Sequence, residues 1–330
     1  MPWFSWSDFL SCRAISALSA LAFIAAGCVT TDKEGVAMRP NLPMPTLGGK
    51  QYWTDVYVYG GWRIQQNVFT KHHRLLGPKD VRKAWGTREQ CQHALELAKD
   101  RGRAVLLSDK VCILLHAFLR SKDSFKGLKK GLEAEGYEVY SVNYASSRYD
   151  LDTLAAQMRP LLERVQEDFE DVYIVTHSMG GIIARKILSQ QEYPKVRRLV
   201  MIAPPNQGAV MADKLLDWWP SQYVTGPAGR QLTADEDSGA RNAGIPMCEF
   251  GVIAGARGTE RGWNRMIPGD DDGLVSVAST RLDGMADFVV VRAWHATIMN
   301  KPKTIHQVIV FLNSGRFDHE AEGVLALPDN

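Results

Sequence analysis

Six short apolar runs divide residues 111–291, and each is bounded by Gly, Pro or charged residues. Continuous apolar runs of this length are typical of strands that are buried on both faces of a sheet. Because helical patterns separate them, the sequence predicts an α/β fold with a mostly parallel central sheet and helices on both faces. The runs cover residues 111–115, 139–142, 172–175, 199–203, 250–254 and 288–291.

Apolar residues at helical spacing predict helices over residues 125–132, 151–165, 182–187 and 305–312. Ligands of such sheets bind at the carboxyl ends of the strands, so residues that follow the six runs are the candidates for a functional site. Earlier in the chain, two strands are expected around Gly60-Gly61, with a helix over 89–99. One domain is expected over 51–330, with a cap insertion at about 207–247 and no further domain.

The first 27 residues have the pattern of a signal peptide. An apolar segment without charge extends from Arg13 to Asp32, and it is too short to span a bilayer comfortably. Ala25-Ala26-Gly27-Cys28 resembles the lipobox of bacterial lipoproteins. That resemblance implies lipidation of Cys28, a tether over 28–50, and a membrane anchor in the bacterial cell envelope, on the periplasmic side of a membrane in a Gram-negative cell. An ordinary signal peptide, cut nearby, is the alternative.

The charge pattern does not favour nucleic acid as a partner. The 39 basic and 37 acidic residues give a formal charge of +2, without a long block of one sign. After cleavage, three cysteines would accompany Cys28, which allows at most one disulfide among Cys91, Cys112 and Cys248. Cys112 and Cys248 lie in or beside apolar runs and are expected to be small buried hydrophobes. The composition leaves the oligomeric state open.

The segment I-V-T-H-S-M-G-G-I, residues 174–182, lies where a predicted strand meets a predicted helix. A serine at the apex of a sharp strand-to-helix turn needs small neighbours, because strand and helix approach each other closely there. Gly180 and Gly181 are such neighbours, whereas Thr176 stands where the motif usually has its first glycine. A serine that only caps a helix would need no glycine pair. The motif therefore favours Ser178 as a nucleophile.

A nucleophilic serine needs a base, and the base needs a third group that fixes its tautomer. His295 follows the run 288–291 by four residues and is the histidine after Ser178 that lies at the carboxyl end of a predicted strand. We therefore predict that His295 is the base. His306, inside the last predicted helix, and His319, in a charged tail, are expected to be structural or solvated.

Three consecutive aspartates, Asp270, Asp271 and Asp272, supply the candidate acid. Asp272 adjoins Gly273 and the apolar Leu274, so it is best placed to leave water and meet an imidazole. Asp270 and Asp271 remain alternatives for the acid. A calcium site is a further alternative, although the spacing matches no known ligand loop, and we expect neither a metal nor a cofactor.

Backbone N–H groups are expected to stabilise the oxyanion. Met179 follows the nucleophile, and Phe118 lies in the loop after the run 111–115, so these two residues are the predicted donors. His116 precedes Phe118 and is expected to brace that loop. His177 is expected to point along the other face of its strand.

Over about residues 108–312 the chain resembles the α/β-hydrolase superfamily, and within it bacterial lipases and esterases. The matching segments are L-L-H-A-F-L-R-S, G-Y-E-V-Y-S-V-N-Y, V-T-H-S-M-G-G, A-P-P-N-Q-G, D-D-G-L-V-S-V and the late W-H. The D-G-L-V segment, with a histidine 23 residues after Asp272, is similar to the acid-to-base segment of Pseudomonas-type lipases. The resemblance implies an α/β-hydrolase fold with Ser178, Asp272 and His295 as its triad. Ala117 and Thr176 depart from glycine at two turns.

The expected activity is hydrolysis of carboxylic esters, by an esterase or lipase that forms an acyl-enzyme with an ester or lipid substrate. An acyltransferase or amidase with the same triad, and a non-catalytic lipoprotein that binds a lipid or a partner, are the alternatives. Leu215, Leu216, Trp218 and Trp219 cluster in the expected cap. They form a lid, the wall of an acyl pocket, or an ordinary amphipathic helix.

Overall fold

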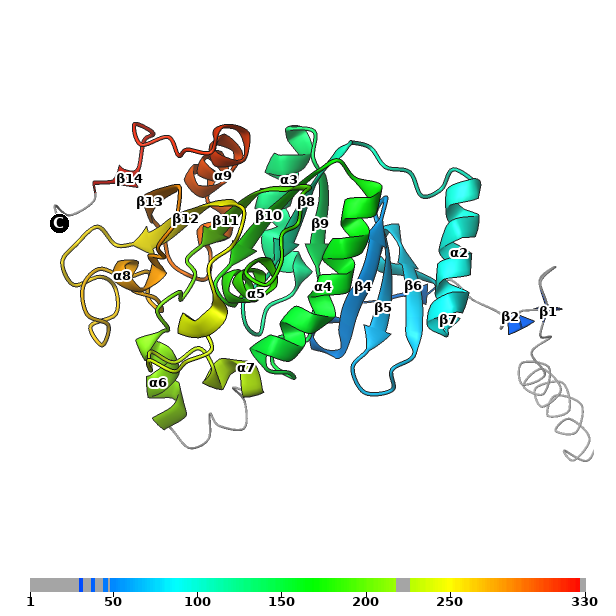
Figure 1. Cartoon of the computed structure of the whole chain (residues 1–330), viewed down its shortest axis with the longest axis horizontal. Helices are drawn as coiled ribbons and strands as arrows, with labels where there is room; N and C mark the ends of the chain where they lie inside the picture. Colours follow the sequence, from blue (N-terminus) through cyan, green and yellow to red (C-terminus); the bar gives the residue numbers. More distant parts are fainter. Residues whose placement is uncertain (1–29, 32–36, 39–43, 47, 218–225, 327–330) are drawn as a thin grey trace, which may run out of the picture.

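The computed structural model describes residues 30–31, 37–38, 44–46, 48–217 and 226–326. A seven-stranded sheet, in the order β14-β13-β12-β11-β10-β8-β9, forms the centre (Figure 1). Its strands pair in parallel, except that β14 is antiparallel to β13. The strands are β8 (Lys110–Leu115), β9 (Glu138–Val142), β10 (Asp171–His177), β11 (Val196–Ile202), β12 (Glu249–Ala256), β13 (Asp287–Arg292) and β14 (Val324–Leu325). Each of the six predicted runs overlaps one parallel strand.

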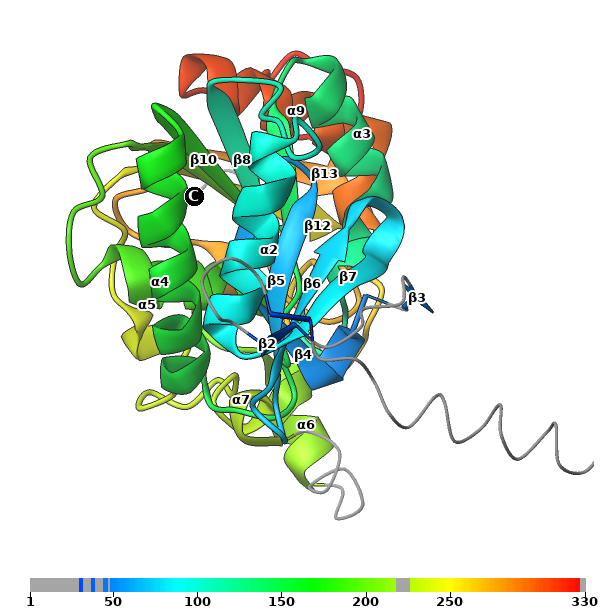
Figure 2. The ribbon, with the colours of Figure 1, turned by 90° about the vertical axis from the view of Figure 1, so that its right-hand side faces the viewer.

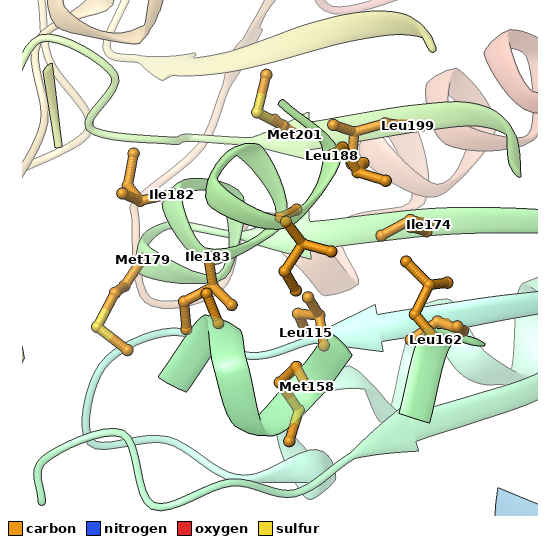
Figure 3. Packing of buried hydrophobic residues seen from close by; sticks show 14 of the residues in the cluster. Leu115, Met158, Leu162, Ile174, Met179, Ile182, Ile183, Leu188, Leu199 and Met201 are labelled. Carbon is orange, nitrogen blue, oxygen red and sulfur yellow. The ribbon is translucent and has the colours of Figure 1, made fainter. Parts of the chain in front are cut away.

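Helices cover both faces of this sheet, because successive side chains of a strand point to opposite faces. On β8, Ile113 packs in an apolar cluster with α4 (Leu151–Asp168) and α5 (Met179–Leu188). The adjacent Leu114 packs on the other face, with α3 (Lys126–Ala134) and α9 (Pro302–Ser314). Figure 3 shows part of the first cluster. The predicted α/β fold and its central helices are thus confirmed.

The helix ends follow local sequence signals. Asp150 precedes α4, and its carboxylate accepts a hydrogen bond of 2.7 Å from the backbone N–H of Thr153. Pro302 is the first residue of α9, where a missing N–H costs nothing, and Gly315 ends that helix in the left-handed region (φ 77°).

A second, antiparallel sheet precedes the first one in the chain. Its order is β3-β7-β6-β5-β4, and Figures 1 and 2 show it beside β9 and α4, with α2 on its outer side. The side chains of Trp62, Leu75 and Leu95 pack in its own apolar cluster. The elements are β3 (Met44–Pro45), β4 (Trp53–Tyr59), β5 (Trp62–Asn67), β6 (His73–Gly77), β7 (Val81–Gly86) and α2 (Arg88–Asp100).

The second sheet extends into the segment that the sequence predicted as a tether. Strand β3 lies within the expected tether 28–50, and the Thr46 hydroxyl donates to the Asp80 carbonyl at 2.9 Å, so the end of that segment is part of the fold. The predicted hairpin at Gly60-Gly61 and the helix α2 are present, but β6, β7 and a separate sheet were not predicted. Strand β6 buries the polar side chain of Arg74 next to Leu75 and Leu76, so it shows no apolar alternation.

Buried polar contacts join the second sheet to the carboxyl end of β9. The Asp55 N–H donates to the Asn143 carbonyl, and the Asn143 N–H donates to the Asp55 carboxylate, both at 2.8 Å. The Asn143 amide also donates to the Trp53 carbonyl at 2.8 Å, and Arg63 pairs with Asp55 at 2.7 Å. Because these contacts are made away from water, they hold β4 in a fixed place beside the main sheet.

The predicted signal peptide (1–27) and Cys28 lie outside the described residues, as do Trp218 and Trp219. Among the residues that the structure describes, none of the helices has the length and apolar character that crossing a membrane requires. The expected cap contains α6 (Val210–Asp217) and α7 (Gly226–Arg230). The remaining elements are α8 (Val277–Thr280) and the paired β1 (Thr30–Thr31) and β2 (Ala37–Met38).

The described cysteines, Cys91, Cys112 and Cys248, are free thiols. Cys112 is fully buried on β8, as expected for a small hydrophobe, whereas Cys248 is only partly buried. Burial raises the pKa of Cys91 and Cys248, each to about 12, so these thiols stay protonated and unreactive near neutral pH.

Candidate active site

Ser178 occupies the turn between β10 and α5, at the carboxyl end of β10. Its backbone has φ 54° and ψ −124°, a conformation that L-residues rarely adopt and that marks functional turns. Gly180 permits this turn, because a Cβ at position 180 would lie 2.3 Å from the Leu115 carbonyl oxygen. The Ser178 residue is 8% exposed, and its hydroxyl makes no hydrogen bond within the described part of the chain.

The structure explains how Thr176 is tolerated where the motif usually has glycine. Thr176 is fully buried, and a Cβ at position 181 would lie 3.3 Å from its hydroxyl oxygen and 3.1 Å from Pro204 Cβ. The second glycine of S-M-G-G therefore leaves the space into which the threonine side chain fits. The larger side chain thus stands on the strand, at Thr176, and the glycine on the helix, at Gly181, so strand and helix can still pack closely.

Asp272 and His295 form a buried pair at the ends of neighbouring strands. The His295 Nδ1 lies 2.6 Å from the Asp272 carboxylate, and the His295 N–H donates to the Asp272 carbonyl at 2.8 Å. The backbone N–H groups of Leu274 and Val275 donate to the other carboxylate oxygen at 3.0 and 2.8 Å. With Nδ1 as the donor to this fixed carboxylate, Nε2 of His295 is left as a proton acceptor.

The three consecutive aspartates point to three different partners. Asp270 accepts backbone N–H groups from Arg257, Gly258 and Thr259, at 2.8 to 3.1 Å. Asp271 accepts from the backbone of the loop around residue 264, and burial raises its pKa. Asp272 is the one that contacts an imidazole. Within the described residues, no group of three or more His, Cys, Asp or Glu side chains is arranged to hold a metal ion.

The imidazole of His295 lies close to the turn that carries Ser178. The ring centroids of His295 and His177 are 4.8 Å apart, and His177 is bonded directly to Ser178. This contact with His295 was not predicted for His177. Burial, followed by the charge of His295, holds the pKa of His177 well below its usual range, so His177 is a neutral neighbour of His295.

Two backbone N–H groups near this turn lack an acceptor within the described residues. Met179 is the first residue of α5, where an N–H has no helical acceptor, and its side chain packs in the apolar cluster of Figure 3. The Phe118 N–H has no hydrogen-bond acceptor among the described residues. Both predicted oxyanion donors are therefore free to bind a substrate oxygen.

His116 braces the loop that carries Phe118. Its Nδ1 donates to the Ala117 carbonyl at 2.8 Å, while its Nε2 accepts the Tyr144 N–H at 3.4 Å. The ring stacks on the Tyr144 ring with centroids 4.0 Å apart, and the Tyr144 hydroxyl donates to the His116 carbonyl. Complete burial lowers the pKa of His116 to about 4, so the ring is neutral at pH 7.

This buried neutral histidine predicts a loss of stability in mild acid. The folded-state pKa of His116 is about 4, below the 6.5 of an exposed histidine, so the unfolded chain binds more protons between these values. Stability is fully present above pH 6.5 and falls as the pH drops towards 4. From pH 7 to pH 5, His116 alone removes about 2 kcal/mol of unfolding free energy.

Urea unfolding of the native protein and of His116→Phe at both pH values measures this effect. Phenylalanine preserves the stacking on Tyr144 but does not titrate, so the variant should lose about 2 kcal/mol less between pH 7 and pH 5, whatever its absolute stability. Equal pH dependence in the two proteins would show that His116 is not the group responsible.

The other two late histidines lie away from Ser178, as expected. His306 contacts Asp318 at 2.9 Å, and His319 contacts Asp287 at 3.0 Å, and both side chains are about half exposed.

A feature not predicted is the stack of Trp263 on Trp294, with centroids 4.5 Å apart, directly beside His295. Trp294 is 52% exposed. The sequence did not predict this contact, because the two tryptophans are 31 residues apart and come together only through the fold of the intervening segment.

The solved structures include a lipase whose fold is similar to that of this chain. The propeptide form of the Bacillus licheniformis lipase BlEst2 is 16% identical, with a TM-score of 0.51 over 67% of this chain and 52% of that one. Its mature form is also 16% identical, with a TM-score of 0.48 over 62% of this chain and 90% of that one. Phospholipase PlaB from Legionella pneumophila is 17% identical, with a TM-score of 0.45 over 60% of this chain and 56% of that one.

The chain thus spans about half the length of the propeptide form of BlEst2 and of PlaB. The comparison with curated proteins finds no match. The family model described as alpha/beta hydrolase family matches residues 112–319, which cover all six parallel strands but not the second sheet. The chain therefore belongs to the alpha/beta hydrolase family.

Proposed function

We propose that this hydrolase cleaves carboxylic esters, with Ser178 as nucleophile, His295 as general base and Asp272 as the acid that orients it. The observation that carries the proposal is the buried contact of 2.6 Å between Asp272 and His295, whose ring packs on the residue next to Ser178. A fixed carboxylate raises the basicity of an imidazole and selects its tautomer. Within the described residues the Ser178 hydroxyl makes no hydrogen bond to His295, and hydrogen bonds between catalytic groups are often long until a substrate binds.

The proposed reaction passes through an acyl-enzyme. The Ser178 oxygen attacks the ester carbonyl carbon while His295 takes the hydroxyl proton, and the carbonyl oxygen becomes an oxyanion that the Phe118 and Met179 N–H groups stabilise. The C–O bond then breaks, and His295 gives its proton to the leaving alcohol. Water, deprotonated by His295, attacks the acyl carbon, and the carboxylic acid and free Ser178 are released.

Two observations favour an ester with an apolar part. Trp294 and Leu274, which adjoin the catalytic candidates His295 and Asp272, are 52% and 43% exposed, so apolar surface lies beside the site. The solved structures of similar fold carry the names lipase, phospholipase and carboxyl esterase. We therefore propose an ester or lipid substrate.

Turnover of p-nitrophenyl esters of increasing chain length tests this function. We expect saturable release of p-nitrophenol and a chain-length preference that identifies the enzyme as an esterase or a lipase. Added alcohols distinguish hydrolysis from acyl transfer. If the release of carboxylic acid stays constant, the enzyme is a hydrolase. If a new ester forms and the release of acid falls, it is an acyltransferase. If the folded protein cleaves none of the esters, the proposed activity is refuted.

We also propose, from the lipobox-like sequence, that lipid on Cys28 anchors the enzyme in the bacterial cell envelope, on the periplasmic side of a membrane in a Gram-negative cell. Cys28→Ser should lose labelling by a fatty-acid analogue and move from the membrane to the soluble fraction of cells. Cys91→Ser, which alters a buried thiol, is the control and should stay in the membrane fraction. Unchanged labelling of Cys28→Ser would contradict lipidation at this residue.

A further inference from the structure

We propose that Gln51 is a positioning residue for the oxyanion site, so that the second sheet takes part in catalysis. The inference rests on the proposed function, because it assigns Gln51 a role through the Phe118 loop. Gln51 lies in the turn that leads into β4, outside residues 112–319 that match the family.

Gln51 bridges the loop that carries Phe118 and the loop that follows β9. Its amide nitrogen donates to the Arg120 carbonyl at 2.7 Å, two residues after Phe118. Its amide oxygen accepts from the Ser146 hydroxyl, the Ser147 hydroxyl and the Ser147 N–H, each at 3.1 Å. One side chain therefore fixes the loop after β8 to the loop after β9.

The loop that carries Phe118 needs such support, because its backbone is strained. Leu119 has φ 56°, a left-handed conformation that a leucine rarely adopts and that persists only when surrounding contacts hold it. The Leu119 N–H donates to the same Ser146 hydroxyl that contacts Gln51, at 3.0 Å. Phe118 is thus held between the bracing of His116 on one side and the Gln51 contacts on the other.

Gln51 itself is held in place by the main sheet. The Asn143 amide donates to the carbonyls of Lys50 and Trp53, at 2.5 and 2.8 Å, so the residues on both sides of Gln51 are fixed to the end of β9. The contact between Asp55 and Asn143 continues this attachment along β4. The second sheet therefore presents Gln51 from a rigid support.

The expected consequence is kinetic, because an oxyanion donor acts only when it points at the developing charge. Release of the Arg120 carbonyl would let the Phe118 N–H move, and small misplacements of catalytic groups cost large rate factors. Substrate binding in the ground state does not depend on this N–H, so kcat should fall while KM stays nearly constant.

Gln51→Ala and Gln51→Glu test the inference in the full-length enzyme. Glutamate keeps the oxygen that accepts from Ser146 and Ser147 but loses the amide donor to Arg120. We expect both variants to lose about 10-fold in kcat, with KM within about twofold of the native value. The matched control is Gln66→Ala, a glutamine of the same sheet whose amide donates to a carbonyl in an exposed hairpin, and it should keep native kcat.

Thermal unfolding of each variant separates positioning from stability. The inference predicts the kcat loss at temperatures where the variants are fully folded. Native kcat in Gln51→Ala or Gln51→Glu, or a loss that disappears on cooling together with a lowered melting temperature, would overturn it. These results presuppose an active native enzyme; failure of the native protein to cleave any ester would instead refute the proposed function.

Discussion

Ser178→Ala should lower kcat for ester hydrolysis by about 10⁵-fold or more, the loss seen when the nucleophile of a serine hydrolase is removed. Without the hydroxyl no acyl-enzyme forms, and the remaining groups support at most slow attack by water. The fold should be preserved, because the Ser178 hydroxyl makes no hydrogen bond within the described residues. Initial rates with a p-nitrophenyl ester, together with a melting curve, measure both effects.

Ser141→Ala is the matched control for this substitution. Ser141 is buried on β9, and its hydroxyl also lacks a partner among the described residues. Its removal should leave kcat within about twofold of the native value, since no contact is lost. Comparable rates in Ser178→Ala and Ser141→Ala would mean that the activity does not depend on Ser178.

Asp272→Asn should lower kcat by about 10⁴-fold. The asparagine amide can donate to Nδ1 of His295, which would force the proton onto Nε2 and leave no base beside Ser178. The substitution keeps the side-chain shape, and its oxygen can still accept the N–H groups of Leu274 and Val275. The loss should therefore be far larger than any change in stability.

The neighbouring aspartates provide controls, because their carboxylates contact loop backbone and not the imidazole of His295. Asp270→Asn and Asp271→Asn alter loop contacts but not the His295 ring, so each should keep kcat within about tenfold of native. If kcat in either variant fell as far as in Asp272→Asn, the assignment of Asp272 as the acid would be contradicted.

The sheet and its helices could be predicted because their signals are local. Strands buried on both faces are continuous apolar runs, and the helices between them repeat every three or four residues. The turn at Ser178 was recognisable from its local S-M-G-G pattern, in which Gly181 lies opposite Thr176, although the close approach at Gly180 is to Leu115 of the neighbouring strand β8. The Asp272–His295 contact was predictable from chain order and strand ends.

The second sheet, His177 and Gln51 could not be predicted, because their contacts are tertiary. Arg74 is buried because its guanidinium donates to Gln65, so its strand β6 shows no apolar alternation. His177 faces His295 only because two strand ends meet in space. The role of Gln51 depends on Arg120, 69 residues later, and on loops from two other strands. Local sequence patterns carry no signal for such pairs.

Labelling with a fluorophosphonate, followed by peptide mass spectrometry, tests most directly that Ser178, His295 and Asp272 act together. The reagent phosphonylates a serine only when a base activates its hydroxyl. We predict one adduct in the folded native protein, on the peptide that contains Ser178, and greatly slowed labelling in Asp272→Asn. Folded native protein without an adduct, or with the adduct on a different serine, would contradict the account.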